Sequence, residues 1–217
     1  MAIHLIRPSH PCDSNVYLLT GNRNLLIDCG TGLSKGYVID QIDSIIPGGK
    51  IDSLILTHCH VDHSGGAGEI INKYGCNCMA FINDAVHLQD ADEAVLYEMF
   101  GIKPQFLDPW ELNDGDLISN GEHSLKVIWT PGHTDGSICL YDESTKSLFS
   151  GDTVFANGVG RTDFPSGFFF DLKSSIERIS SIDIIDLYPG HGDPVMQVGS
   201  LAVKAALELV RCSYEDH

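Results

Sequence analysis

The chain has 217 residues, of which 43% are hydrophobic and 20% are charged, and its formal net charge is −17. This composition is typical of a soluble globular protein, and we expect one domain, residues 1–217, with a substantial hydrophobic core. The negative charge argues against a nucleic-acid partner, because nucleic-acid-binding faces are usually basic. No apolar run approaches the ~20 residues of a membrane span, and no secretory signal is visible, so we expect a cytoplasmic protein without a membrane partner.

Strand-like apolar runs alternate with helical patterns along the chain. Strands are predicted at residues 15–20, 24–28, 52–56, 78–82, 124–129, 137–141, 146–150 and 184–188. Helices are predicted at about residues 34–46, 67–74, 84–100, 171–180 and 197–212. The spacing in the last helix predicts a core-facing stripe of Val198, Leu201, Ala202, Ala205 and Leu209. This mixture of strands and helices indicates α/β layers.

The most informative segment is Thr57–His63, which reads Thr-His-Cys-His-Val-Asp-His and directly follows the apolar run 51–56. It brings three imidazoles and one carboxylate into six positions. One face of a helix or strand cannot gather four such side chains, but a loop that folds back around an ion can. Ten histidines would rarely cluster in this way by chance. The segment therefore predicts a metal site at the C-terminal end of a strand.

Three later turns each place one His or Asp beside glycine, just after an apolar strand. The candidates in these turns are His133, Asp152 and His191. Glycine allows the backbone to turn sharply and to approach a ligand closely. Each turn alone is more often structural, but together with the first cluster they predict one metal centre assembled from four strand ends.

On these residues the chain resembles the metallo-β-lactamase superfamily of hydrolases, from Asn15–Leu19 to Gly190–Gly192. The resemblance implies a four-layer αβ/βα sandwich, in which two mixed β-sheets lie face to face with helices outside. The family's ordered motifs are matched with no ligand position missing, by Asp28, His58, His60, Asp62, His63, His133, Asp152 and His191. A metal-free binding protein is disfavoured for the same reason.

The resemblance also divides the ligands between two ions. The first ion would be held by three histidines, His58, His60 and His133. The second would be held by one carboxylate and two histidines, Asp62, His63 and His191. Asp152 would bridge the ions, and Asp28 would brace the metal loop without binding metal. Because the donors are imidazoles and carboxylates, we expect two divalent cations, zinc first, with iron or manganese as alternatives.

Such a centre implies hydrolysis. Two adjacent cations lower the pKa of bound water, so that hydroxide near neutral pH can attack a polarised carbonyl. Asp62 and Asp152 are the carboxylates we expect to take part in catalysis. With hydroxide as the nucleophile, no side-chain nucleophile is needed.

Residues after the bridging Asp favour a thioester substrate. Lactonases of the superfamily have a proton-donating Tyr three positions after this Asp, where this chain has Phe155. A thiol has a pKa of about 8.5, so a thiolate leaves without a general acid. The stretch Gly158–Gly167 resembles short glyoxalase II-like hydrolases, and Arg161 matches a Lys that meets glutathione there. Arg161 would then bind a substrate carboxylate; alternatively, it pairs with Asp163 and fixes a loop.

A second function fits the same residues. The stretch 160–164 also resembles persulfide dioxygenases, which hold one iron with two His and one Asp and are not hydrolases. Because 26 residues follow His191 in this sequence, we expect one domain without the glutathione-binding helical domain of glyoxalase II proper. We therefore expect a small-molecule acyl thioester as the partner, of which S-lactoylglutathione is the natural test compound; a homo-oligomer is left open.

Overall fold

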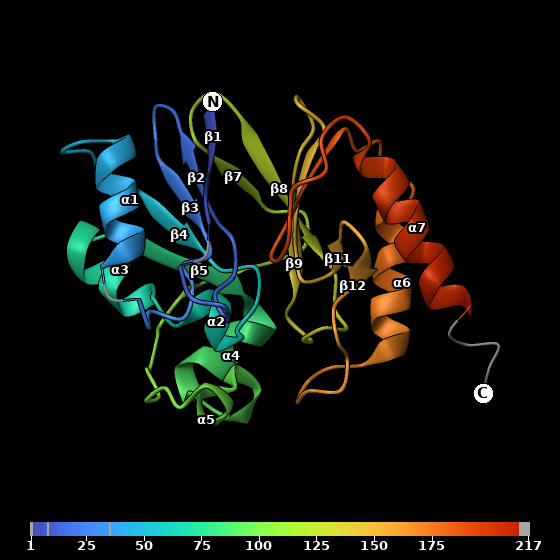
Figure 1. The fold of residues 1–217 in the computed structure, drawn as a ribbon, viewed down its shortest axis with the longest axis horizontal. Helices are drawn as coiled ribbons and strands as arrows, with labels where there is room; N and C mark the ends of the chain where they lie inside the picture. Colours follow the sequence, from blue (N-terminus) through green and yellow to red (C-terminus); the bar gives the residue numbers. More distant parts are fainter. Residues whose placement is uncertain (1, 8, 35, 213–217) are drawn as a thin grey trace.

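Two β-sheets lie face to face, and helices cover their outer surfaces (Figure 1). The computed structural model describes residues 2–7, 9–34 and 36–212. In Figure 1 the layers follow one another across the view, with α1 and α3 on one side and α6 and α7 on the other. The predicted fold class, a four-layer αβ/βα sandwich of two mixed sheets, is confirmed.

The first sheet has the strand order β1-β2-β3-β4-β5-β6. The pairs β1·β2 and β2·β3 are antiparallel, whereas β3 to β6 run parallel. Its strands are β1 Ala2–Ile6, β2 Val16–Thr20, β3 Leu25–Ile27, β4 Ser53–Ile55, β5 Asn77–Phe81 and β6 Trp110–Leu112. Because parallel neighbours end at the same edge of a sheet, the segments that follow β4 and β5 emerge side by side.

The second sheet has the order β13-β10-β9-β8-β7, and a small hairpin, β11·β12, lies apart from it. The pair β10·β13 is parallel, and the other pairs are antiparallel. Its strands are β7 Leu117–Ser119, β8 Ser124–Trp129, β9 Ile138–Asp142, β10 Ser147–Gly151 and β13 Asp186–Pro189. The hairpin strands are β11 Val154–Phe155 and β12 Gly158–Val159. Strands β8, β10 and β13 thus point the same way and end at one edge.

The helices occupy three places. The first sheet is covered by α1 Tyr37–Ile45 and α3 Ala67–Tyr74, and the second by α6 Phe169–Ile179 and α7 Gly199–Cys212 (Figure 1). Short helices surround the edge where the strands end, namely α2 Val61–Ser64, α4 Ile82–Asp90, the 3-10 turn η1 Glu93–Val95 and α5 Tyr97–Phe100. None of the helices in the described part of the chain is both long and apolar enough to cross a membrane.

Alternate side chains along the strands pack into separate hydrophobic cores. In β2, Leu18 packs toward α1 and α3, whereas Tyr17 and Leu19 face the second sheet. Between the sheets, the rings of Tyr17 and Phe149 meet edge to face at 5.4 Å, and Phe149 stacks on Tyr188 at 4.9 Å. A third core lies between the second sheet and α6 and α7. The sheets are therefore held rigidly behind the edge that carries the site.

Two sequence predictions about helices are wrong. The helix predicted at 84–100 is broken, because Ala91 and Leu96 adopt φ values of 48° and 67°, which no helix interior contains. In α7 the predicted core stripe is largely on the wrong face: Leu201 is 61% exposed and Leu209 is 49% exposed. The helix is apolar on more than one side, so its periodicity does not determine which face is buried. The residues that it buries are Gly199, Ala202, Val203, Ala206, Leu207 and Val210.

Candidate metal centre

The candidate ligands converge at the edge where β4, β8, β10 and β13 end. His58 and His60 lie in the loop after β4, and Asp62 and His63 lie on α2, which continues that loop. His133, Asp152 and His191 follow β8, β10 and β13. The common direction of these strands is what brings residues distant in the sequence to one place.

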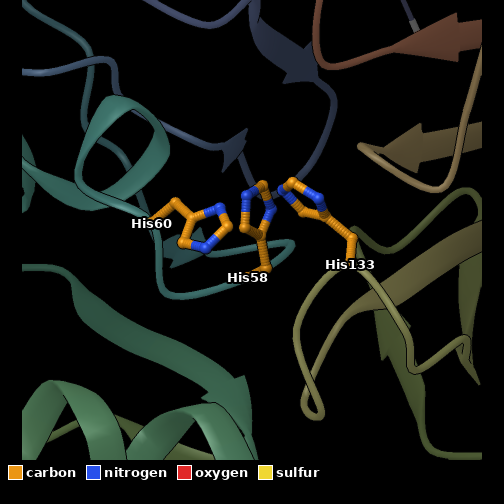
Figure 2. Close-up of side chains that lie close together, drawn as sticks. All are labelled: His58, His60 and His133. Atoms are coloured by element: carbon orange, nitrogen blue, oxygen red, sulfur yellow. The ribbon is translucent and has the colours of Figure 1, made fainter. Parts of the chain in front are cut away.

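Three buried histidines form the first group. One nitrogen each of His58, His60 and His133 lies within 4.8 Å of the others, and Figure 2 shows the three rings pointing toward one another. Their ring centroids are 4.5 to 4.8 Å apart. The Nε2 atoms of all three are buried and have no hydrogen-bond partner among the described residues. Unpaired buried nitrogens cost free energy, but a lone pair on neutral imidazole is a metal ligand, so the group fits a cation.

The second group contains one carboxylate and two histidines. One donor atom each of Asp62, His63 and His191 lies within 4.8 Å of the others. Nε2 of His191 lies 3.1 Å from Oδ2 of Asp62 and 3.3 Å from Nε2 of His63. Three donors from two separate strand ends therefore face one point, as a second cation would require.

Asp152 faces both groups. Its Oδ1 lies 3.2 Å from Nε2 of His63, and its Oδ2 lies 3.6 Å from Nε2 of both His133 and His191. Gly190 makes this approach possible, because a Cβ atom there would lie 2.3 Å from Oδ1 of Asp152. The carboxylate thus has the position that a bridge between two ions needs, and the cluster has the donors of a two-metal site.

The electrostatics of the cluster suit cation binding. Burial lowers the pKa of His58 well below its usual value and that of His60 to about 3, with the neighbouring histidines adding to the effect. These rings are therefore neutral near pH 7, with lone pairs free for a metal. Burial opposes ionisation of Asp152, but His63, His133 and His191 together outweigh burial and hold the pKa of this carboxyl far below its usual range.

Asp28 lies behind the metal loop. Its Oδ2 is 2.8 Å from Nδ1 of His63, and its Oδ1 accepts a hydrogen bond from the backbone N–H of Thr57 at 2.8 Å. The hydroxyl of Thr57 also donates to Oδ2 at 2.8 Å. On the other side of the centre, Nδ1 of His133 lies 2.7 Å from the carbonyl oxygen of Arg161. Such partners fix the orientation of an imidazole and direct its other nitrogen toward the ion.

Asp84, on α4, is a supporting residue that the sequence did not reveal. Its fully buried carboxylate accepts hydrogen bonds from the backbone N–H of Cys59 at 2.6 Å, the hydroxyl of Thr134 at 2.9 Å and the N–H of Gly136 at 3.0 Å. Cys59 lies between His58 and His60, and Thr134 follows His133. Asp84 therefore ties the two loops of the first group together. Burial raises its pKa to about 6.

A pocket of about 280 Å³ opens over the cluster. Its floor is formed by His60, Asp62, His133, Asp152 and His191. Arg161 lies at its rim and makes a two-pronged ion pair with Asp163, at 2.7 and 2.9 Å, which is the structural contact considered for it from the sequence. Phe155 lines the wall, with its ring centroid 6.1 Å from that of His191.

Comparisons with known proteins agree with this geometry. The model of the metallo-beta-lactamase superfamily matches residues 10–191. A probable metallo-hydrolase of Methanocaldococcus jannaschii is 42% identical over 190 residues, which cover 83% of this chain and 88% of that protein. A hydroxyacylglutathione hydrolase of Francisella philomiragia is 36% identical over 143 residues, 65% of this chain and 50% of the relative.

The fold is also found among solved structures. The crystal structure of TTHA1623 in a di-iron-bound form is 25% identical, with a TM-score of 0.77, and the match covers 93% of this chain and 97% of that one. The family match spans the strand ends that carry all the candidate ligands. The chain therefore belongs to the metallo-beta-lactamase superfamily.

Proposed function

We propose that this superfamily member is a metal-dependent hydrolase that cleaves small acyl thioesters. The observation that carries the proposal is the complete donor set beneath an open pocket, with Asp152 facing both groups. The similarity to a hydroxyacylglutathione hydrolase supports the thioester class. His58, His60 and His133 would hold one ion, Asp62, His63 and His191 the other, and Asp152 would bridge them.

The donor set suits zinc, iron or manganese, because it contains nitrogen and oxygen but no thiolate. Two bound divalent cations would supply hydroxide near neutral pH and would polarise the carbonyl of the substrate. Asp62 and Asp152 contribute negative charge that stabilises the cations, while Asp28 and Asp84 hold the ligand loops in place. The pocket opens directly over these donors, so a carbonyl can reach the floor.

The residue that lines the pocket after Asp152 indicates which leaving group the site suits. Phe155 stands three positions after Asp152 and has no proton to donate. An alkoxide or amide anion leaves poorly without a proton, whereas a thiolate leaves readily because the thiol pKa is only about 8.5. A thioester is therefore the ester class best matched to this wall.

The alternative function is a persulfide dioxygenase with a single iron. It requires two histidines and one carboxylate, and Asp152 with two of the histidines would suffice. The second donor group favours the hydrolase, because Asp62, His63 and His191 are also gathered around one point and a one-iron centre leaves them without an ion.

Metal analysis of the purified protein, combined with two assays, tests the proposal. We expect two metal ions per chain and release of thiol from S-lactoylglutathione or a related thioester. One iron per chain, oxygen uptake with glutathione persulfide and no thioester cleavage would instead establish the dioxygenase.

A further inference from the structure

The walls of the pocket over the metal centre are apolar. One wall consists of Leu96, Met99 and Phe100, from the segment between η1 and the end of α5. The other apolar residues that line the pocket are Phe155, Val159 and Phe164. The polar groups lie on the floor, where the reacting carbonyl belongs. A substrate bound there would place its carbonyl beside the candidate ligands and its substituent among these apolar side chains.

The pocket offers little to a charged substituent. Arg161 is the only Lys or Arg among its described lining residues, and its guanidinium is already paired with Asp163 and lies 4.2 Å over the ring of Phe164. The chain as a whole carries a net charge of −17, which repels anions. The lining residues therefore suit a neutral, apolar substituent better than a carboxylate or a hydroxyacyl group.

Leu96 is held in an unusual conformation at the end of this pocket. Its φ of 67° lies in the left-handed region, which leucine rarely adopts. Backbone strain of this kind persists where the surrounding structure enforces it, and it is concentrated at functional sites. Here it turns the chain between η1 and α5 and places the buried Leu96 side chain in the pocket wall.

Leu96 and Met99 also line a second hollow of about 400 Å³. Its other lining residues include Asp92, Glu93 and Pro104, none of which lines the pocket over the metal centre. The two side chains therefore separate the hollows. Of the two, Leu96 is buried and Met99 is 60% exposed, so Leu96 is the fixed part of the partition.

We propose that the pocket binds the acyl group of the substrate, that this group is short and apolar, and that Leu96 sets the limit on its length. The proposal rests on the thioester hydrolase function and names its substrate class. The acyl chain and the thiol sulfur are both attached to the carbonyl carbon, so polarity decides which substituent the pocket takes. An apolar acyl chain matches the apolar lining, whereas a polar thiol carrier can extend through the open mouth into solvent.

The polarity of the acyl group is tested with two isosteric substrates. The isobutyryl and lactoyl thioesters of N-acetylcysteamine differ only by a methyl group in place of a hydroxyl, and both have an uncharged carrier. After division by the rate of each with hydroxide alone, we expect kcat/KM to be at least about tenfold higher for isobutyryl. Equal values, or a preference for lactoyl, would overturn the apolar selection.

The length limit is tested with straight-chain thioesters from acetyl to decanoyl. For the wild-type protein we expect kcat/KM to peak at a short chain. Leu96→Gly suits the left-handed backbone and removes the partition, so kcat/KM for octanoyl relative to butyryl should rise about tenfold or more. Leu96→Met, which keeps the volume, should retain the wild-type profile.

Gln197→Gly is the matched control, because Gln197 has the same φ of 67° but lies just before α7, outside the pocket. It should leave the chain-length profile unchanged. If Leu96→Gly also leaves the profile unchanged, Leu96 does not set the limit and the proposal fails.

A binding measurement separates this proposal from the proposed function. If the metal-loaded protein cleaves no thioester, the hydrolase assignment is wrong, and calorimetry with the S-isobutyl and S-(2-hydroxypropyl) thioethers of N-acetylcysteamine still tests the pocket. Tighter binding of S-isobutyl, weakened by Leu96→Gly, would support the apolar pocket. Equal binding of the two thioethers, or no binding of either, would overturn it.

Discussion

Asp152 is the side chain on which the two-ion arrangement depends. It is the only candidate ligand whose carboxylate faces both donor groups, with His63 on one oxygen and His133 and His191 on the other. Asp152→Ala should therefore reduce the metal content by at least one ion per chain. Activity should fall by more than the roughly 10–100-fold typical of an outer-sphere partner, while the fold persists.

Elemental analysis, steady-state kinetics and circular dichroism measure these three effects. Asp193→Ala is a suitable control, because Asp193 lies two positions after His191 but is exposed and pairs with Arg7 at the surface. Full activity with two bound ions in Asp152→Ala would show that the carboxylate does not bridge.

Two buried carboxylates make their direct contacts with different halves of the centre, although Asp28 also reaches His58 indirectly, through the hydroxyl of Thr57 at 3.1 Å from Nδ1 of His58. Asp28 contacts His63 of the second group, whereas Asp84 connects the loops that carry His58, His60 and His133. Asp28→Asn should therefore weaken the second ion and Asp84→Asn the first, each by about 10–100-fold in affinity. Competition with a chelator, followed with a spectroscopically distinct metal in each site, measures the two affinities separately. Loss of the same ion in both variants would contradict this division.

The sequence revealed Asp28 but not Asp84, for a physical reason. The candidate ligands lie in short motifs soon after strands, so their signal is local, and Asp28 was expected from the family resemblance. Asp84 acts through the backbone N–H of Cys59, which is distant in the sequence, and its own surroundings read as an ordinary first turn of a helix. Only the parallel pairing of β4 and β5 brings the two together.

At the scale of elements, the segment 84–100 shows what helical periodicity misses. Its residues favour one continuous helix, yet α4 ends at Asp90 and the chain turns at Ala91 and Leu96 without a glycine or proline. One signal was present: Asp92 caps η1 by accepting a hydrogen bond from the N–H of Ala94 at 2.9 Å, as Asp often does at a helix start. The break at Leu96 lets this residue, with Met99 and Phe100 of α5, line the pocket over the candidate metal centre, so helical periodicity is overridden beside the candidate site.

His87 on α4 connects α4 to Asp92 at the start of η1 and to Asp135 in the loop after β8. Its Nδ1 lies 2.7 Å from Asp92 and its Nε2 lies 3.2 Å from Asp135, and these carboxylates raise its pKa to about 9 despite partial burial. The unfolded chain has a His pKa of about 6.5. A raised pKa stabilises the fold fully below pH 6.5, and this contribution is lost as the pH rises through 9.

His87→Gln should therefore cost about 1–2 kcal/mol of unfolding free energy at pH 6, after allowance for solvent screening, and almost nothing near pH 10. Urea unfolding of the wild-type protein and of His87→Gln between about pH 6 and pH 10 measures the difference in unfolding free energy. Titrating groups that both proteins share cancel in this difference. His123→Gln is a control, because His123 pairs with Asp142 at the start of β8, whereas α4 contacts the loop after the end of β8. A cost that grows with pH would contradict the charged state of His87.

At the scale of the whole molecule, the sequence predicts eight of the strands and most of the longer helices, but not how they assemble. The predicted runs include β8, β9 and β10, but they miss β6, β7 and the β11·β12 hairpin, which are two or three residues each, and also the five-residue β1, Ala2–Ile6. Nothing in a strand's own sequence states that β10 pairs in parallel with β13. The two-sheet arrangement was expected only from the family resemblance, which supplies these long-range pairings.

The net charge of −17 predicts that an anionic substrate binds less readily at low ionic strength. Acidic side chains gather beside the mouth of the pocket, where Asp92, Glu93 and Glu98 line the adjoining hollow. A glutathione thioester is an anion, so at low ionic strength this field opposes its approach. Raising the salt from about 0.01 M to 0.1 M shortens the screening length from about 30 Å to 10 Å and weakens that repulsion.

The KM for S-lactoylglutathione should therefore fall a few-fold over this range, while the KM for the uncharged lactoyl thioester of N-acetylcysteamine stays constant. Glu98→Gln, at an exposed position on α5, should reproduce part of the fall at low salt and leave the neutral substrate unaffected. If both substrates responded equally to salt, the effect would lie in the metal centre and not in the field. If the anionic substrate bound more tightly at low salt, Arg161 would have to reach its carboxylate despite Asp163, and the role expected for it from the sequence would regain support.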